Sequence, residues 1–247
     1  MTPRFPIPVR INFKKTFPYL NRGFRAALWS LLAYTASSYA DISGKIELSS
    51  ERTFRGIAQT ENNFAPSISA KYESKVGVYF GTLISRNDFR NPTDSSEQRY
   101  FLGYSPEIAG SIGLDATYIY YDFRQSAENG NTDWSEAHLR LSFNQATALL
   151  FSAADNWIGQ GITYQLEVNH LHSLTNRLSI QALAGIALIP EDSIEDYTYA
   201  GLGIIYGATP RVYLRADINA ADNAAETLFG DRSDSTARLS IGYLFNN

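Results

Sequence analysis

One feature constrains this chain more than any other: apolar and polar side chains alternate, residue by residue, along most of its length. In the stretch "ISGKIELSSERTFRG", residues 42–56, Ile46 and Leu48 share one parity while Lys45 and Glu47 share the other. Successive side chains of a β-strand point to opposite faces of the sheet. This stretch is therefore predicted to be a strand with one apolar face and one charged face.

The same alternation recurs along the chain and predicts twelve strands, most of them about 9–12 residues long. They lie near 42–48, 64–73, 76–85, 99–104, 112–121, 136–143, 148–154, 162–169, 178–188, 197–206, 211–218 and 236–245. The connections between them alternate between five short turns and six longer loops. This pattern predicts antiparallel strands with both chain ends on the short-turn side.

Strand length and loop alternation are typical of bacterial outer-membrane barrels, which have short periplasmic turns and longer outside loops. Lipid would solvate the apolar parity and a watery lumen the charged one, and closure leaves no strand edge unpaired in hydrocarbon. We therefore predict an all-β fold over residues 41–247: a transmembrane antiparallel up-and-down β-barrel of about 12 strands. The alternative is a soluble sandwich or lipocalin-like barrel with the apolar parity inward. The number of strands, the aromatic strand ends and the charges of the polar parity weigh against it.

Residues 1–40 have the composition of a secretory signal peptide. They carry six basic and no acidic residues, an apolar run too short to span a bilayer, and the small-x-small ending Ser38-Tyr39-Ala40. Cleavage after Ala40 would leave 15 basic and 25 acidic residues, a net charge of −10. That charge argues against a nucleic-acid partner, and a chain without cysteine has no disulfide or thiolate metal site.

The segment 49–85 resembles the opening of the TorF-type porins, a proteobacterial family of exported proteins. The residues that carry the resemblance are Phe54-Arg55-Gly56, Gln59, Pro66, Gly77, Tyr79, Gly81 and Ser85. Arg52 and Leu83 depart from the family pattern, which tends to have Tyr and Trp there. The resemblance implies an outer-membrane porin with the family motif Phe54, Arg55, Gly56 and Gln59, and it implies no particular substrate.

Parity also predicts which side chains line the lumen. They are Lys45, Glu47, Glu51, Lys71, Glu73, Arg99, Asp115, Glu136, His138, Arg140, Glu167, Arg211, Arg215, Asp217 and Arg238, with seven positive and seven negative groups besides the histidine. Barrels of about 8 strands are filled by side chains, whereas about 16–18 strands leave an open channel. A pore lining and a salt-bridged plug are both consistent with these residues.

Together these features predict a narrow passive channel for small hydrophilic solutes or ions. Acidic loops, with Glu191, Asp192, Glu195 and Asp196 as one cluster, would give it a weak cation preference. The alternatives are a structural or adhesive barrel with a plugged lumen, or a lipid-modifying enzyme. The enzyme is disfavoured because Asn169 and His170, as neighbours in a strand, point to opposite faces and cannot act together, and because His170 lies beside a short turn. No catalytic residue, metal ligand or cofactor is predicted, and solvated charge is favoured over a divalent-cation site in the loops.

The expected location is the bacterial outer membrane, reached by export through the periplasm. The expected partners are outer-membrane lipid and lipopolysaccharide, small hydrophilic solutes, and the barrel-assembly machinery. The last would read the C-terminal strand, where Tyr243 and Phe245 stand at alternate positions before two asparagines.

Overall fold

The structure is a computed structural model. It describes residues 41–88, 96–106, 108, 110–124, 133–159, 161–191 and 194–246. The segment predicted to be a signal peptide, residues 1–40, lies outside the described residues. Within the described part of the chain, no helix is both long and apolar enough to cross a membrane.

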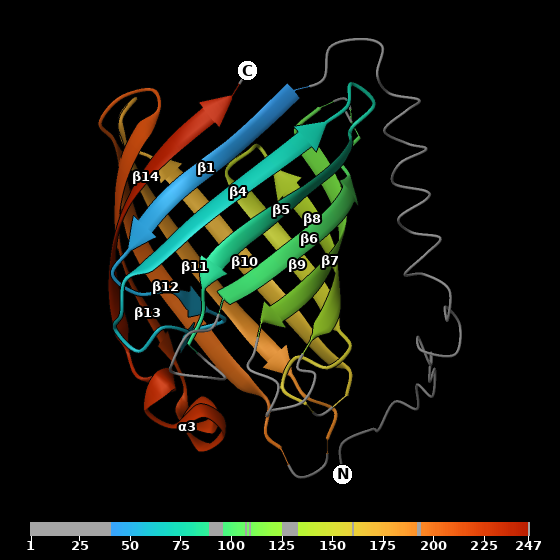
Figure 1. The fold of residues 1–247 in the computed structure, drawn as a ribbon, viewed down its shortest axis with the longest axis vertical. Helices are drawn as coiled ribbons and strands as arrows, with labels where there is room; N and C mark the ends of the chain where they lie inside the picture. The colour runs from blue at the N-terminus through green and yellow to red at the C-terminus, as the bar shows by residue number, and fades with distance from the viewer. Residues whose placement is uncertain are drawn as a thin grey trace. The chain divides into compact units, whose positions relative to one another are not determined.

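Twelve antiparallel strands form a closed barrel (Figure 1). They are β1 (Asp41–Ser49), β4 (Ala65–Glu73), β5 (Val78–Arg86), β6 (Ser96–Tyr104), β7 (Ile112–Arg124), β8 (Trp134–Phe143), β9 (Thr147–Ala154), β10 (Thr163–Ser173), β11 (Leu178–Leu188), β12 (Tyr197–Gly207), β13 (Val212–Ala221) and β14 (Thr236–Asn246). Each strand pairs with its neighbour in the chain, and β1 closes the ring by pairing with both β4 and β14. The predicted all-β antiparallel barrel of about 12 strands is confirmed.

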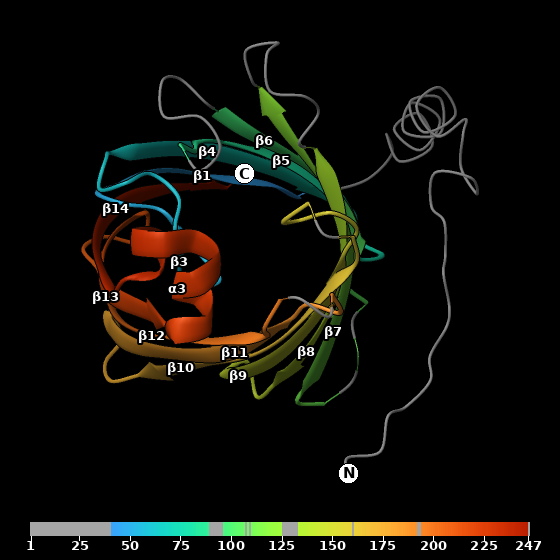
Figure 2. The same cartoon turned by 90° about the horizontal axis from the view of Figure 1, so that it is seen from below.

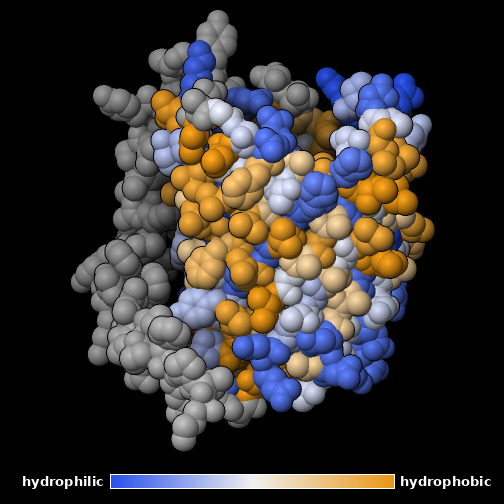
Figure 3. All heavy atoms as spheres, turned by 180° about the vertical axis from the view of Figure 1, so that it is seen from behind, coloured by the Kyte–Doolittle hydropathy of each residue, from blue (hydrophilic) through white to orange (hydrophobic). Residues whose placement is uncertain are grey.

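The apolar parity faces outward. Directly paired residues lie on the same face of a sheet, and Ile46 pairs with Ile68 on one side and Tyr243 on the other. These side chains are exposed, as are Leu202 on β12 and Leu239 on β14, at 52% and 67%. Figure 3 shows such apolar side chains over the middle of one face, with hydrophilic ones gathered toward its ends. In water so much exposed apolar surface would be unfavourable, whereas in hydrocarbon it is the matching surface.

The two ends of the barrel differ in their connections. At one end the strands are joined by short turns, such as that after β8, where Asn144 and Gln145 both have positive φ. At the other end two long connections carry their own structure. The first holds the hairpin β2 (Thr53–Phe54) and β3 (Ile57–Ala58); the last holds helix α3 (Asn223–Phe229) and the 3-10 turn η1 (Gly230–Ser233). Seen along the barrel in Figure 2, β3 and α3 lie within the ring of strands.

The inner wall uses one arrangement three times: a tyrosine lies over a glycine of the next strand and reaches a carboxylate on the strand beyond. The sets are Tyr79–Gly103–Asp115, Tyr199–Gly185–Glu167 and Tyr213–Gly242–Glu47. A Cβ at any of these glycines would collide with the tyrosine ring. Each set therefore ties three adjacent strands together from inside, and glycine is needed where the ring lies flat on the backbone.

Candidate functional site

The hairpin between β1 and β4 folds into the lumen at the long-loop end. We call residues 51–63 the plug hairpin. Its turn consists of Arg55 and Gly56, with φ of 54° and 79°, as a two-residue type I′ turn requires. A Cβ at Gly56 would lie 2.7 Å from Cβ of Tyr199. The positive φ and this close approach both explain why glycine occupies position 56.

Glu51 holds the base of the plug hairpin. Its carboxylate accepts hydrogen bonds from the backbone N–H groups of Arg52 and Thr60, both at 2.8 Å, and from that of Asn62. It also accepts the Thr60 hydroxyl at 2.5 Å. The Glu51 side chain is only 1% exposed, so it shapes the hairpin instead of facing an open pore. Removing it would leave several buried donors unsatisfied.

Arg55 at the tip of the hairpin is held by the barrel wall. Its Nη2 forms an ion pair with Glu136 of β8 and donates to the Ser152 hydroxyl of β9 at 3.2 Å. Its Nε donates to Oε1 of Gln165 on β10 at 2.7 Å. The guanidinium also stacks 4.3 Å from the ring centroid of Trp157, in the loop after β9. The Arg55 side chain is 3% exposed, so water is almost excluded from this contact.

A second arginine, Arg52, fixes the side of the hairpin. Its two terminal nitrogens donate to the two oxygens of Glu97 on β6, at 3.0 and 2.8 Å. Glu97 also pairs with Arg99 and accepts a hydrogen bond from Asn87 at 2.6 Å. A bidentate arginine–carboxylate pair is stronger and more directional than a simple contact. Two arginine side chains thus attach the plug hairpin to the wall, and its Gln59 carbonyl also accepts the backbone N–H of Asp88, just beyond β5, at 2.7 Å. Among the described strands, β2 and β3 pair only with each other.

An aromatic cluster surrounds the hairpin and fills the long-loop end of the lumen. Tyr121 and Trp134 are stacked with centroids 3.7 Å apart, and the ring of Phe54 lies about equally far from both, at 6.3 and 6.2 Å. Phe229 of α3 packs against Trp157, at 6.0 Å. Ile57, Tyr121, Trp134, Ala154, Trp157, Ala187, Ile189, Tyr197, Tyr199 and Ala225 form its buried core. Buried side chains of the wall, the plug hairpin and α3 therefore pack against one another at this end of the barrel.

Toward the short-turn end, the predicted lumen residues are mostly paired with one another. Lys45 lies 3.3 Å from Glu47, and Lys71 pairs with Glu73. Arg215 and Arg238 share Asp217, at 2.8 and 2.9 Å. Asp115 and Glu167 accept the tyrosine hydroxyls described above, and Arg140 is exposed on the inward parity.

Three predicted lumen residues lie in other surroundings. Glu136 is 1% exposed, with the Nε2 of His138 3.1 Å from its carboxylate. Glu51 belongs to the base of the hairpin. Arg211 lies in the short turn before β13, where it reaches the hydroxyl of outward-facing Tyr243 at 3.5 Å. The four family-motif residues, Phe54, Arg55, Gly56 and Gln59, all belong to the plug hairpin, in which Gln59 donates to the Ile57 carbonyl at 3.1 Å.

Sequence reasoning missed the wall residues that hold the hairpin: Ser85, Glu97, Ser152, Gln165 and Trp157. Extending the fourth predicted strand, 99–104, by two residues at its start would have placed Glu97 on the same face as Arg99. The pair Arg55-Gly56 between short apolar segments was a weak signal for a two-residue hairpin. The others carried no local signal, since a polar residue on an inward parity has many possible partners.

The acidic loops differ among themselves in structure. Asp88 is buried and paired with Arg86, whereas Glu191 and Glu195 are exposed. Asp222 is the N-cap of α3 and accepts the backbone N–H groups of Ala224 and Ala225 at 3.1 and 3.3 Å. Slight burial raises the pKa of Asp222, but hydrogen bonds from Thr198 and from these amides outweigh it and lower the pKa below its usual value. Within the described ranges, no group of three or more acidic or histidine side chains could hold a metal ion.

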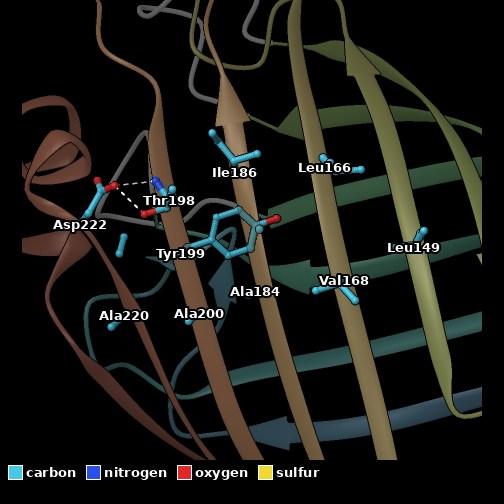
Figure 4. Close-up of a pocket in the computed structure, with 12 residues that line it drawn as sticks. Leu149, Leu166, Val168, Ala184, Ile186, Thr198, Tyr199, Ala200, Ala220 and Asp222 are labelled. Carbon is cyan, nitrogen blue, oxygen red and sulfur yellow. Dashed lines mark hydrogen bonds between the residues drawn. The ribbon is translucent and has the colours of Figure 1, made fainter.

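The outer wall has a shallow apolar groove of about 620 Å³ over β9 to β13. The small side chains of Ala184, Ala200 and Ala220 line this groove, together with larger ones such as Leu166 and Ile186. Figure 4 shows Asp222 at one end of it, joined to Thr198 by two hydrogen bonds of 2.7 Å.

His170 also lies on the outward face. Its Nδ1 is 2.8 Å from the Thr147 hydroxyl, and its ring centroid is 6.3 Å from that of His172 on the same face.

Comparison with known proteins gives one family and a set of similar folds. Residues 33–188, more than half of the chain, match a family described as "Bacterial protein of unknown function (Gcw_chp)". No curated protein matches the sequence. A KdgM porin structure, in complex with disordered oligogalacturonate, has a TM-score of 0.54 at 8% identity; the alignment covers 83% of this chain and 98% of that one.

Two further outer-membrane proteins have the same fold. The NanC porin has a TM-score of 0.52 at 9% identity, covering 83% of this chain and 98% of that one. The COG4313 outer membrane channel from Pseudomonas putida F1 has a TM-score of 0.51 at 9% identity, covering 87% and 98%. At such identities the similarity shows a shared barrel fold and no shared ligand.

Proposed function

This chain belongs to the Gcw_chp family of bacterial proteins of unknown function, and we propose that it is a porin-like outer-membrane channel, closed in the present conformation by its plug hairpin. Small hydrophilic solutes or ions would pass through its narrow lumen. We also propose that it is related to the TorF-type porins, whose motif residues Phe54, Arg55, Gly56 and Gln59 form the plug hairpin. The chemistry is passage alone, and no reaction is assigned to the lumen.

The observation that carries this proposal is how the plug hairpin is attached. Its own strands do not join the barrel sheet, and Arg52 and Arg55 connect it to Glu97 and Glu136 of the wall. Ion pairs and hydrogen bonds can be exchanged for contacts with water or solute, whereas a strand within the sheet cannot leave without opening the barrel. Beyond the hairpin, the wall carries charged and hydroxyl groups that suit a hydrated passage.

A second function is favoured by the aromatic cluster. Trp157, Tyr197 and Phe229 pack against each other at 5.7–6.2 Å and join helix α3 to the wall. Such packing resembles a permanent core and suits a structural or adhesive barrel that passes nothing. In that case the surface at the long-loop end would make the functional contacts with other molecules.

We propose a weak cation preference, with the acidic long loops as its source. Exposed Glu191 and Glu195 would raise the local cation concentration within a Debye length of about 8–10 Å at 0.1–0.15 M salt. The charges of the inner wall are mostly paired and would contribute little to the sign.

Export and location follow the same proposal. A signal peptide cleaved after Ala40 would deliver the chain to the periplasm, and assembly machinery reading the last strand would insert it among outer-membrane lipids and lipopolysaccharide. N-terminal sequencing of protein from outer-membrane fractions should begin at Asp41; an intact Met1 would contradict this processing.

Planar-bilayer recording of the refolded protein tests the channel. We expect small, infrequent openings, with a reversal potential in a salt gradient that favours cations weakly and less so as salt rises. A folded barrel that never conducts at any voltage would support the structural function instead. An anion preference at low salt would refute the role given to the acidic loops.

A further inference from the structure

The pocket that holds Arg55 has a feature of its own: among the described residues, every hydrogen-bond partner of the guanidinium belongs to the barrel wall, and the hairpin contributes only the Phe54 ring, 4.7 Å from the guanidinium carbon. Glu136, Ser152 and Gln165 lie on the adjacent strands β8, β9 and β10, and Trp157 follows β9 directly. We infer that these four residues form a binding site for a guanidinium-bearing solute, and that Arg55 occupies it as an internal stand-in. The inference rests on the proposed channel only for the route by which the solute arrives.

The contacts are specific for a planar guanidinium. The Nε of Arg55 donates a hydrogen bond to the amide oxygen of Gln165, and its Nη2 donates to both the carboxylate of Glu136 and the hydroxyl of Ser152. Trp157 covers the flat face of the group at 4.3 Å. A guanidinium has donors along its edge and a face that stacks on aromatic rings, whereas an ammonium has neither the edge nor the face. The pocket therefore suits arginine-like solutes better than simple amines.

The pocket would persist if the hairpin left. The Tyr121 hydroxyl donates to Oε2 of Glu136 at 3.0 Å, and His138 approaches the same oxygen at 3.1 Å. Ser152 donates to Gln165 at 3.0 Å, which fixes the amide oxygen. Held in this way, the carboxylate would face the lumen without its cation. A buried carboxylate without a balancing cation is unfavourable, so the vacated site would attract a cation of the same shape.

The backbone of Arg55 supports the same inference. Its φ of 54° is in the left-handed region, which glycine and asparagine adopt more readily than arginine. A residue held in a disfavoured conformation is a pointer to function when its side chain makes contacts no other type could make. Here the arginine side chain completes the pocket although the turn does not favour arginine.

Free solute would have to compete with a tethered one. A group on a short linker has an effective concentration in the mM range, so a free guanidinium competes with Arg55 only at comparable concentrations. Binding of the solute in the pocket would thus displace Arg55 and the tip of the plug hairpin. The attachment of the plug hairpin to the wall would be weakened as a result.

The test uses the Arg55→Ala variant refolded in detergent, titrated with L-arginine and followed by calorimetry. L-citrulline, whose neutral urea group replaces the guanidinium, and L-lysine, with equal charge and an ammonium, are the matched probes at constant ionic strength. We expect saturable arginine binding in the mM range and at least tenfold weaker binding of both other probes. Adding Glu136→Gln should weaken arginine binding at least tenfold. The control Arg177→Ala, in an exposed short turn, keeps the plug and should bind arginine more weakly than Arg55→Ala.

Equal binding of arginine and citrulline, or no effect of Glu136→Gln, would overturn the inference. If Arg55→Ala does not fold, hydrogen exchange on the native protein decides: arginine, but not citrulline, should reduce amide protection in the plug hairpin, and unchanged protection would overturn it. Because binding is measured without a membrane, the two proposals can fail separately. Arginine binding with silent bilayers removes the channel and keeps the site, and conduction without arginine binding does the reverse.

Discussion

The direction of each side chain in the barrel predicts how the protein tolerates charge. Leu202 is the sixth of eleven residues of β12, points outward with 52% of its surface exposed, and pairs directly with Ala182 and Ile218. Leu202→Arg would place a guanidinium near the middle of the hydrocarbon, which costs about 2–4 kcal/mol in outer-membrane barrels. At 1.4 kcal/mol per factor of ten, that is roughly a 30- to 700-fold loss in the folding equilibrium.

Two variants calibrate this loss. Leu214 is the third residue of β13 after a short turn, so an arginine there could extend to the interface, where the cost falls to about 0–1 kcal/mol. Arg215→Leu changes the lumen, and Asp217 keeps two contacts with Arg238, at 3.0 and 2.9 Å. Folding into lipid vesicles across a urea series, read from heat-modifiable gel mobility, should rank Leu202→Arg as the most harmful. If Arg215→Leu is as harmful as Leu202→Arg, the assignment of faces is wrong.

The other expectations concern the wall, the α3 cap and the loops. Gly103→Ala should destabilise the barrel by about 1–3 kcal/mol because its methyl group would collide with a tyrosine ring, whereas Gly113→Ala, with its nearest neighbour at 3.5 Å, should be tolerated in the same urea series. Asp222→Ala should weaken the start of α3 by about 1 kcal/mol. Since folding lowers the pKa of Asp222, its contribution is complete above the ordinary value of 3.8 and is lost as pH falls through the lowered pKa; unchanged amide protection in α3 between pH 5 and pH 2 would contradict this. Neutralising Glu191 and Glu195 to Gln should reduce the cation preference in reversal-potential measurements and leave folding unchanged.

The barrel could be predicted from sequence because its rule is local. The pleat fixes a period of two, and a wall between lipid and water imposes opposite chemistry on alternate positions. Twelve such runs with alternating loop lengths specify an up-and-down barrel without any knowledge of contacts. The pairing of Tyr72 with Phe80, or of Leu141 with Leu149, follows from strand order and the length of the short turn between the two strands.

The plug could not be predicted because its contacts are distant in sequence and do not follow a period. Arg55 and Glu136 are 81 positions apart, and Arg52 and Glu97 are 45 apart. Parity says that Glu136 points inward, but it does not give its height in the barrel or whether a loop folds in to meet it. The resemblance to the TorF-type porins drew attention to Phe54-Arg55-Gly56, and the structure places those residues at the tip of the plug hairpin, against the wall.

Conductance with and without the plug hairpin tests the central claim most directly. The hairpin can be removed by replacing residues 52–62 with Gly-Ser-Gly, since Ser49 and Ala65 are already paired at the ends of β1 and β4 and need only a short link. Both proteins would be refolded, checked for heat-modifiable mobility, and recorded in planar bilayers at equal amounts. The account predicts rare, small openings for the native chain and a steady, larger conductance for the shortened one. Two folded barrels that are equally silent would contradict it.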